Sequence, residues 1–145
     1  AGLEPWTDPH NADRRFARVR LRLDALPALE AAIGPGVAAA LARTADQVQE
    51  DSAALDTLAE ELAPELAELA DAGIALPVHA LAANPPALRH RLIRLAVEGE
   101  FGVTLSRAQT LEVARLVGDW HGQGAVHLPG IRVERLGGRI RFTAA

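Results

Sequence analysis

Arginine side chains are the groups in this sequence best suited to binding an anion. Five of them fall within nine residues near the start of the chain: Arg14, Arg15, Arg18, Arg20 and Arg22. The chain contains no lysine, so each basic contact would come from a planar guanidinium that can hold a phosphate or carboxylate through two parallel hydrogen bonds. The concentration predicts a polyanionic partner. The alternative is a solvated helix face with no partner.

Helical spacing separates these arginines from the apolar residues between them. Arg14, Arg18 and Arg22 recur every four residues, so they share one side of a helix. Phe16 and Val19 begin an apolar stripe on another side. We therefore expect a helix that buries one stripe and presents a basic one.

A second group of arginines follows in the C-terminal half of the chain. Arg89, Arg91 and Arg94 lie beside an apolar helix face that contains Leu88 and Leu92. Further along, the chain supplies two more candidates for phosphate contact, Arg107 and Arg115. The sequence thus predicts a second basic surface on helices.

The loop Trp120-His121-Gly122-Gln123-Gly124 combines an aromatic ring, an imidazole and two glycines. Such a loop can stack a nucleobase on Trp120 or His121 and hold a phosphate with backbone N–H groups. A turn between a helix and a strand explains the same residues without any ligand. Trp120 and His121 are therefore binding candidates with an open structural alternative.

Catalytic patterns are missing from the sequence. Cysteine and lysine are absent, which excludes thiolate nucleophiles and Schiff-base chemistry by this chain. The histidines have no metal-ligand spacing and are scattered: His10, His79, His90, His121 and His127. We expect no catalytic residue, no cofactor site and no metal site in this chain.

Composition and charge indicate what kind of protein carries these arginines. The 145 residues are 49% hydrophobic, enough for a folded core. No apolar run is long enough for a transmembrane helix or a signal peptide, so we expect a cytoplasmic protein without membrane contact. Residues 1–43 carry a net charge of +1, residues 44–88 of −9 and residues 89–145 of +4. Because the chain begins with alanine and contains no methionine, we expect a piece of a longer protein.

The helices of the N-terminal half are predicted from caps and spacing. We expect a first helix over about 13–26, ended or kinked at Pro27, and a stop at 34–36. A long helix is predicted over 37–71, with an exact heptad spacing of Leu41, Val48, Leu55, Leu62 and Leu69. Asp51 and Ser52 interrupt that apolar seam, which favours a bundle helix over a coiled coil.

The C-terminal half changes from helical to strand periodicity. We expect an extended stretch over 74–81, a helix opened by Pro85-Pro86 and a helix capped by Ser106. Three short strands over 125–128, 131–136 and 139–142 predict a small antiparallel meander. The predicted fold is therefore mainly α with this C-terminal meander (α+β), a helical bundle with one long helix. The domain division is expected near residue 35.

Two stretches together resemble a known family. They are Asp8-Pro9-His10-Asn11-Ala12-Asp13 with Phe16-Ala17-Arg18-Val19-Arg20-Leu21-Arg22, and Val117-Gly118-Asp119-Trp120-His121-Gly122-Gln123-Gly124 followed by Leu128-Pro129-Gly130. They look like bacterial tRNA(Ile)-lysidine synthetase of the short actinobacterial type, in the region C-terminal to its ATP-pyrophosphatase catalytic domain. The family's Ser-Gly-Gly-x-Asp-Ser signature for ATP is absent, so this chain should be inactive alone.

The resemblance implies a ligase that uses ATP and Mg to attach lysine to the wobble cytidine of isoleucine tRNA with a CAU anticodon. Residues 1–35 would be the helical tail of the missing N-terminal catalytic domain, and residues 36–145 the tRNA-contacting substrate-binding domain. The implied contacts to tRNA(Ile) are Arg14, Arg18, Arg22, Arg89, Arg91, Arg94, Arg107, Arg115, Trp120 and His121. The alternative is a helical scaffold or dimerisation module with no RNA contact. The oligomeric state is open.

Overall fold

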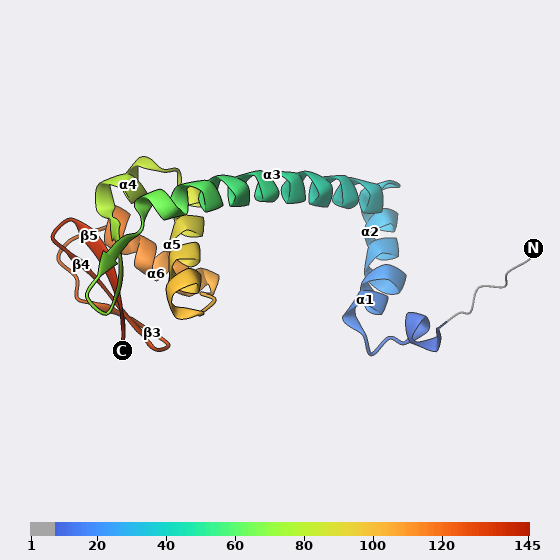
Figure 1. The fold of residues 1–145 in the computed structure, drawn as a ribbon. Coiled ribbons are helices and arrows are strands. Elements are labelled where there is room, and N and C mark those ends of the chain that lie inside the picture. Colours follow the sequence, from blue (N-terminus) through green and yellow to red (C-terminus); the bar gives the residue numbers. More distant parts are fainter. Residues whose placement is uncertain (1–7) are drawn as a thin grey trace, which may run out of the picture. The chain divides into compact units, whose positions relative to one another are not determined.

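The structure is a computed structural model that describes residues 8–145. The chain divides into two compact units, Ala1–Glu50 and Asp51–Ala145 (Figure 1). Their boundary falls inside the long helix α3 (Val37–Leu66). The two units are defined by contacts within the chain and not by function. The predicted boundary between functional domains near residue 35 therefore stays a prediction.

The N-terminal unit is built from short helical segments joined end to end. The Asp8 carboxylate accepts a hydrogen bond of 2.9 Å from the backbone N–H of His10 and so caps the first turn. The side chain of Val19 is buried in this unit. Its elements before α3 are η1 (Pro9–Ala12), α1 (Ala17–Arg20), the π-helical turn η2 (Leu21–Ala25) and α2 (Leu26–Ile33).

The helix continues past Pro27 as α2. Of the two outcomes predicted at Pro27, an end or a kink of the first helix, the end was therefore wrong. Proline lacks an N–H group and its ring crowds the carbonyl four residues before it. The wider turn η2 lies directly ahead of Pro27, and such a turn lets a helix continue without that clash. The predicted stop is confirmed, because Gly34 ends α2 with a φ of 123°.

Helix α3 packs over only part of its length. Ala59 is fully buried, and Leu62 and Leu66 pack against the same core. Leu41 and Val48, which belong to the predicted heptad, are 53% and 60% exposed. The helix therefore joins the C-terminal core through its last turns.

Helix α3 ends at Leu66, five residues before the predicted end at Asp71. The next residues form β1 (Glu68–Ala70), which pairs with β2 (Gly73–Pro77) through a tight turn at Ala72. Gly73 has a φ of 156°, and a Cβ atom there would lie 2.1 Å from the carbonyl oxygen of Phe142. Pairing with β2 supplies backbone hydrogen bonds that a continued helix would otherwise provide.

The sheet has five antiparallel strands in the order β1-β2-β5-β4-β3. The predicted meander is confirmed as its last three strands, and β1 and β2 extend it. The extended stretch predicted over 74–81 is only partly strand, because α4 (Val78–Ala83) begins directly after β2. The meander strands are β3 (Val126–Leu128), β4 (Ile131–Leu136) and β5 (Arg139–Ala144).

One face of the sheet is covered by helices and the other is bare (Figure 1). Val133, Ile140 and Phe142 are fully buried on the covered face, because alternate residues of a strand point to the same side of the sheet. Arg132 and Arg139 lie exposed on the other face. The covering elements are α4, α5 (Pro86–Phe101) and α6 (Arg107–Gly118).

The predicted helix signals of the C-terminal unit are confirmed. Pro86 is the first residue of α5, and Gly102 ends it in a left-handed conformation with a φ of 64°. Ser106 and Gln109 form a complete capping box at the start of α6. The α+β class with one long helix is therefore confirmed. Within residues 8–145 no single helix is long and apolar enough to cross a membrane, and only the bent pair Ala17–Ile33 and Val37–Leu66 satisfies that criterion jointly.

Candidate nucleic-acid interface

A groove of about 430 Å³ lies between α5 and α6 in the C-terminal unit. Leu111 and Ala114 of α6 form its apolar floor, and Pro86 lies at the start of α5 beside it. The full lining is Pro86, Arg89, His90, Leu111, Ala114, Arg115, Gly118 and Asp119. Apolar surface and basic side chains thus meet in one hollow.

Two sequence-predicted arginines, Arg89 and Arg115, line this groove, and two others, Arg94 and Arg107, lie near it but outside its lining. Arg94 lines a separate hollow with Asp56, Glu60 and Glu98. Arg94 of α5 and Arg107 at the start of α6 make no hydrogen bond or ion pair with any residue in the part of the chain that the structure describes. Arg115 pairs with Asp119 at 3.5 Å, and both side chains are largely exposed. Exposed ion pairs of this kind contribute little stability, so Arg115 can exchange Asp119 for another anion.

His90 lines the α5–α6 groove, and nearby arginines affect its pKa. Burial lowers the pKa of the His90 imidazole, and the charges of Arg89, Arg107 and Arg94 lower it further. No carboxylate contributes to the shift. The groove is therefore a region where a positive charge is disfavoured and an anion is attracted.

Stability should fall at mildly acidic pH because of His90. Its pKa is lower in the folded chain than in the unfolded chain, so the unfolded chain binds more protons below about pH 6.5. The free energy of unfolding contributed by this group therefore decreases as the pH falls below about 6.5. We expect His90→Gln to lessen the loss between about pH 7 and 5.5 in urea denaturation.

The exposed His127 provides the matched control for that measurement. His127→Gln should leave the acid loss as large as in the wild type, because His127 lies on strand β3 at the surface. Equal acid loss in wild type and His90→Gln would show that folding does not lower the pKa of His90.

Arg89 is held by the end of α4 rather than presented to solvent. Its guanidinium donates hydrogen bonds to the carbonyl oxygens of Leu81 at 2.8 Å, Ala82 at 3.3 Å and Asn84 at 3.0 Å. The last carbonyls of a helix have no partner within the helix, and this fork supplies one. Arg89 thus has a structural role, and its predicted contact with tRNA stays a prediction.

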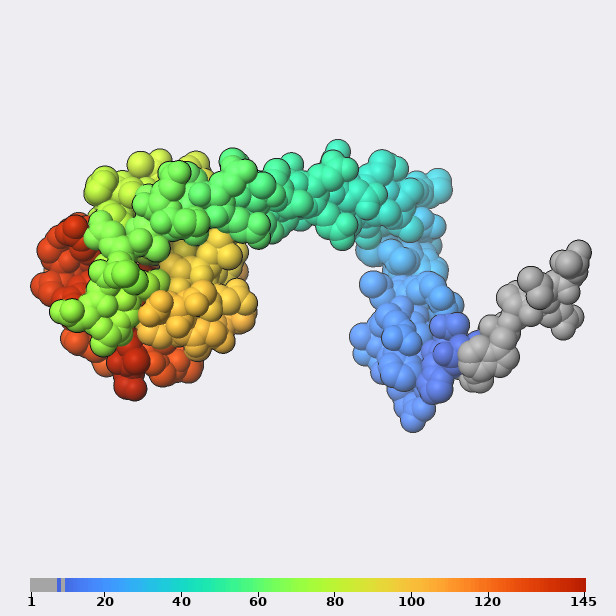
Figure 2. Space-filling model, in the orientation of Figure 1, coloured from blue at the N-terminus to red at the C-terminus, as the bar shows by residue number. Residues whose placement is uncertain are grey.

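Arg91 ties α5 to the last part of α3. Its guanidinium donates to Asp56 Oδ1 at 2.5 Å and to Ser52 Oγ at 3.0 Å, and its side chain is 16% exposed. Figure 2 shows α5 packed directly against this end of α3. Arg91 is therefore occupied by the protein in this structure, and its predicted RNA contact also stays a prediction.

The N-terminal arginines make local contacts within their own unit. Arg14 pairs with Asp24 at 3.1 Å, and the guanidinium of Arg18 lies 5.0 Å from the centre of the Phe16 ring. Arg22 donates to the carbonyl oxygen of Asn11. Arg14 and Arg18 keep exposed side chains, so these contacts leave room for an anion.

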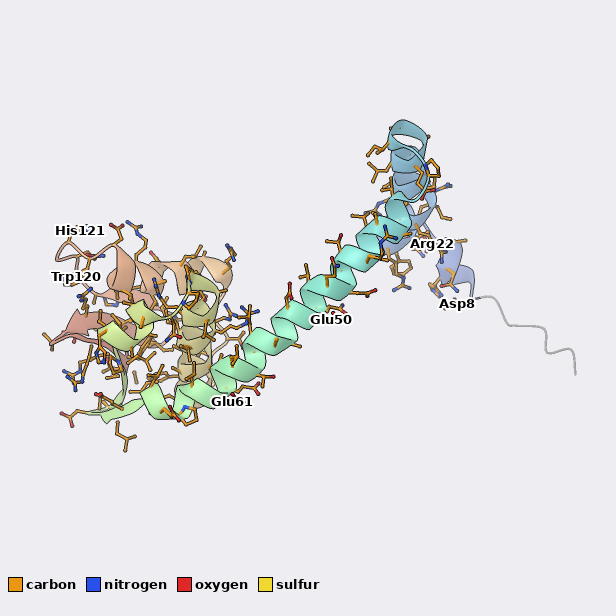
Figure 3. All side chains as sticks on the ribbon, turned by 90° about the horizontal axis from the view of Figure 1, so that it is seen from above. Asp8, Arg22, Glu50, Glu61, Trp120 and His121 are labelled. Atoms are coloured by element: carbon orange, nitrogen blue, oxygen red, sulfur yellow. The ribbon has the colours of Figure 1, made fainter. Side chains whose placement is uncertain are left out.

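Trp120 and His121 lie in the loop that follows α6 (Figure 3). Trp120 is 38% exposed, and the Arg135 guanidinium lies 5.2 Å from the centre of its ring. Gln123 braces the loop, since its side chain accepts from the His121 N–H at 2.9 Å and donates to the Asp119 carbonyl at 2.9 Å. Trp120 is thus a surface residue that packs on Arg135, and its role in stacking a base stays a prediction.

The sequence reasoning missed two groove residues, His90 and Leu111. His90 precedes Arg94 by four residues on α5, and Leu111 follows Arg107 by four residues on α6, so helical spacing places each beside a predicted arginine. That spacing was the available signal. Only the packing of α5 against α6 brings His90 and Leu111 into one groove.

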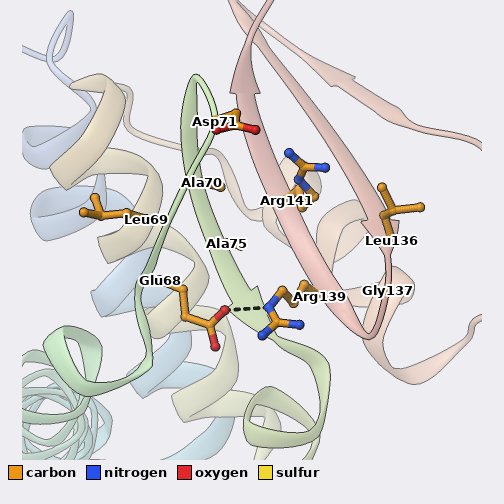
Figure 4. Close-up of a pocket in the computed structure, with 9 residues that line it drawn as sticks. All are labelled: Glu68, Leu69, Ala70, Asp71, Ala75, Leu136, Gly137, Arg139 and Arg141. Carbon is orange, nitrogen blue, oxygen red and sulfur yellow. Dashed lines mark hydrogen bonds and ion pairs between the residues drawn. The ribbon is translucent and has the colours of Figure 1, made fainter.

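The bare face of the sheet carries a second basic hollow, of about 540 Å³ (Figure 4). Arg139 donates to Glu68 Oε2 at 2.5 Å, and Arg132 pairs with Glu134 at 2.8 Å. Arg141 lies opposite Glu134 in the strand register. Carboxylates thus neutralise much of this face, which makes it a weaker anion site than the α5–α6 groove.

Residues 8–145 contain no group of three or more histidine, aspartate or glutamate side chains placed to hold a metal ion. None of the predicted site residues forms a nucleophile and base pair. The basic side chains of the groove lining suit an anionic ligand, and the lining contains no serine, threonine or cysteine nucleophile.

The family described as the TilS substrate binding domain matches residues 76–141 of this chain. A tRNA(Ile)-lysidine synthase of Leifsonia xyli subsp. xyli (strain CTCB07) is 60% identical over 143 residues, which are 98% of this chain and 43% of that relative. The tRNA(Ile)-lysidine synthase of Streptomyces coelicolor is 46% identical over 95% of this chain and 39% of its own length. That of Mycobacterium tuberculosis (strain ATCC 25618 / H37Rv) is 48% identical over 86% of this chain. The chain spans less than half the length of these relatives.

Proposed function

Because the chain belongs to the tRNA(Ile)-lysidine synthase family, we propose that it is the part of such an enzyme that binds the tRNA. The observation that carries this proposal is the position of the α5–α6 groove. The matched residues 76–141 contain both helices, and therefore Arg94, Arg107 and Arg115. Arg94 and Arg107 have no partner among the described residues, and the ion pair of Arg115 with Asp119 is exposed. Such arginines are suited to phosphate contacts, which supply a large share of the affinity of a protein for nucleic acid.

The distribution of charge supports the same role. The nine acids of residues 44–88 lie apart in sequence from the arginines of residues 89–145. A polyanion is attracted to the basic part and repelled by the acidic part, so the tRNA would be oriented as it approaches. Phosphate contacts of this kind set orientation, while the shape of the RNA gives selectivity.

The reaction belongs to the whole enzyme in this proposal. The parent protein would attach lysine to the wobble cytidine of isoleucine tRNA with a CAU anticodon, in the cytoplasm, with ATP and Mg held by an N-terminal catalytic domain. This chain would deliver the tRNA to that domain. Its own sequence has no glycine-rich phosphate loop to hold ATP.

A binding measurement tests the proposal. We expect the chain to bind unmodified isoleucine tRNA with the CAU anticodon more tightly than a non-cognate tRNA, with affinity that falls steeply as salt increases. Fluorescence anisotropy across a salt series gives both results. A folded chain that binds neither tRNA would overturn the proposal.

A second candidate function is self-association through α3. The exposed Leu41 and Val48 are seven residues apart, as in a coiled-coil seam. Sedimentation equilibrium at low protein concentration distinguishes this candidate, because a scaffold would dimerise without RNA. Dimerisation together with absence of tRNA binding would favour the scaffold.

A further inference from the structure

We propose that the α5–α6 groove holds one unpaired nucleotide of the bound RNA, with its base on Leu111 and Ala114 and its phosphate on the arginines at the rim. This inference rests on the proposed function and makes it more specific. It assigns to the groove a single-stranded part of the RNA rather than a duplex.

The apolar floor of the groove is the first reason. Leu111 is 38% exposed although it lies among arginines, and Ala114 and Pro86 continue the apolar surface beside it. A phosphate gains nothing from such a surface. A nucleobase does, because its flat apolar face can pack against apolar side chains in a protein pocket.

The rim supplies the complementary charge. Arg107 lies one helical turn before Leu111 on α6, and Arg115 lies one turn after it. Arg115 lines the groove, and Arg107 lies outside the lining but close enough to act on His90. Guanidinium groups are therefore available on both sides of Leu111 along α6 for the phosphates of one nucleotide. The pair of Arg115 with Asp119 closes one end of the groove.

The size of the groove also favours a single nucleotide. Its volume of about 430 Å³ is within the range of small-molecule sites. Duplex RNA keeps its bases stacked and presents mainly phosphates and 2′-hydroxyls, so it would not reach an apolar floor between two helices. An unpaired nucleotide can turn its base inward.

His90 adds a contact that depends on pH. Its imidazole lines the groove together with Arg89 of α5, Arg115 of α6 and the carboxylate of Asp119. The charges of Arg89, Arg94 and Arg107 also act on it. A phosphate at the rim would offset the repulsion from these arginines and allow His90 to take up a proton. Binding of the nucleotide is therefore expected to strengthen at mildly acidic pH.

The variant Leu111→Ser tests the base contact without changing charge. The probes are a short single-stranded oligoribonucleotide of mixed sequence and a duplex of the same strand length, measured by anisotropy with the full chain. We expect Leu111→Ser to weaken single-strand binding about fivefold, at the low end of losses for a removed stacking contact, and to leave duplex binding and the salt slope unchanged. Leu136→Ser is the matched control, because Leu136 is a 54% exposed leucine on β4 outside the groove.

Leu111→Phe gives a second, independent readout. A larger apolar face at the same exposed position should keep or increase single-strand affinity, and thermal melting of both variants shows that they are folded. If tRNA binds while Leu111→Ser loses no single-strand affinity, the inference fails and the proposed function stands. If the wild type binds neither tRNA nor oligonucleotide, the proposed function fails. Equal binding of polyglutamate, with the same sensitivity to Leu111→Ser, would identify an acidic peptide as the ligand and overturn the nucleotide.

Discussion

Replacing Arg94 and Arg107 together by alanine is expected to lower the affinity for tRNA about a hundredfold, because each charge-assisted contact to a phosphate contributes roughly tenfold. Neither guanidinium has a partner among the described residues, so its loss should not destabilise the chain. The slope of log affinity against log salt should become less steep by about 1.5, since two phosphate contacts are removed. Anisotropy across a salt series measures both effects.

The matched control removes two arginines from the bare face of the sheet. Arg132→Ala with Arg141→Ala changes the net charge of the same unit by the same amount. If the α5–α6 surface is the contact, this control loses far less affinity and keeps the salt slope. Equal losses in the two double variants would indicate attraction by net charge alone and would remove the groove from the binding site.

Arg89→Ala is expected to lower the stability of the chain and to leave the salt dependence of tRNA binding unchanged. It should lower the free energy of unfolding by about 2 kcal/mol, because the last carbonyls of α4 lose three hydrogen bonds from a guanidinium. The salt slope of tRNA binding should stay unchanged, since this guanidinium is already occupied. Urea denaturation and the salt series are measured on the same preparation.

Two further variants make the Arg89 result interpretable. Arg89→Lys should recover only part of the stability, because an ammonium cannot reproduce the planar fork that reaches three carbonyls. Arg43→Ala, at an exposed position of α3, should change stability by less than about 0.5 kcal/mol. If Arg89→Ala leaves stability intact and flattens the salt slope, Arg89 is a phosphate ligand, as the sequence predicted.

The sequence did not predict that neighbouring arginines of α5 have different roles. Arg89, Arg91 and Arg94 are one short motif in the sequence, with the same chemistry and nearly the same helix position. The structure gives them three different environments: Arg89 caps α4, Arg91 binds Asp56 and Ser52, and Arg94 has no partner among the described residues. The partners come from segments up to 39 residues away, which no local pattern reveals.

The sheet shows the same limit for the fold. The meander was predictable because its turns contain Gly130, Gly137 and Gly138, all of which adopt positive φ. Strands β1 and β2 were assigned to a helix and to a longer extended stretch. Strand β2 pairs with β5, more than sixty residues further along the chain, and β1 pairs with β2.

Local physical chemistry in the sequence determined where most of the helices begin, which strand faces are apolar and how charge is distributed along the chain. Caps, prolines, glycines and alternation act between near neighbours, so they can be read without a structure. Tertiary packing alone decided which arginines form hydrogen bonds within the protein and which have no partner among the described residues. That outcome depends on the contact of α5 with α6 and on the carbonyls and carboxylates of distant segments, because a guanidinium binds whatever acceptor the fold brings within reach.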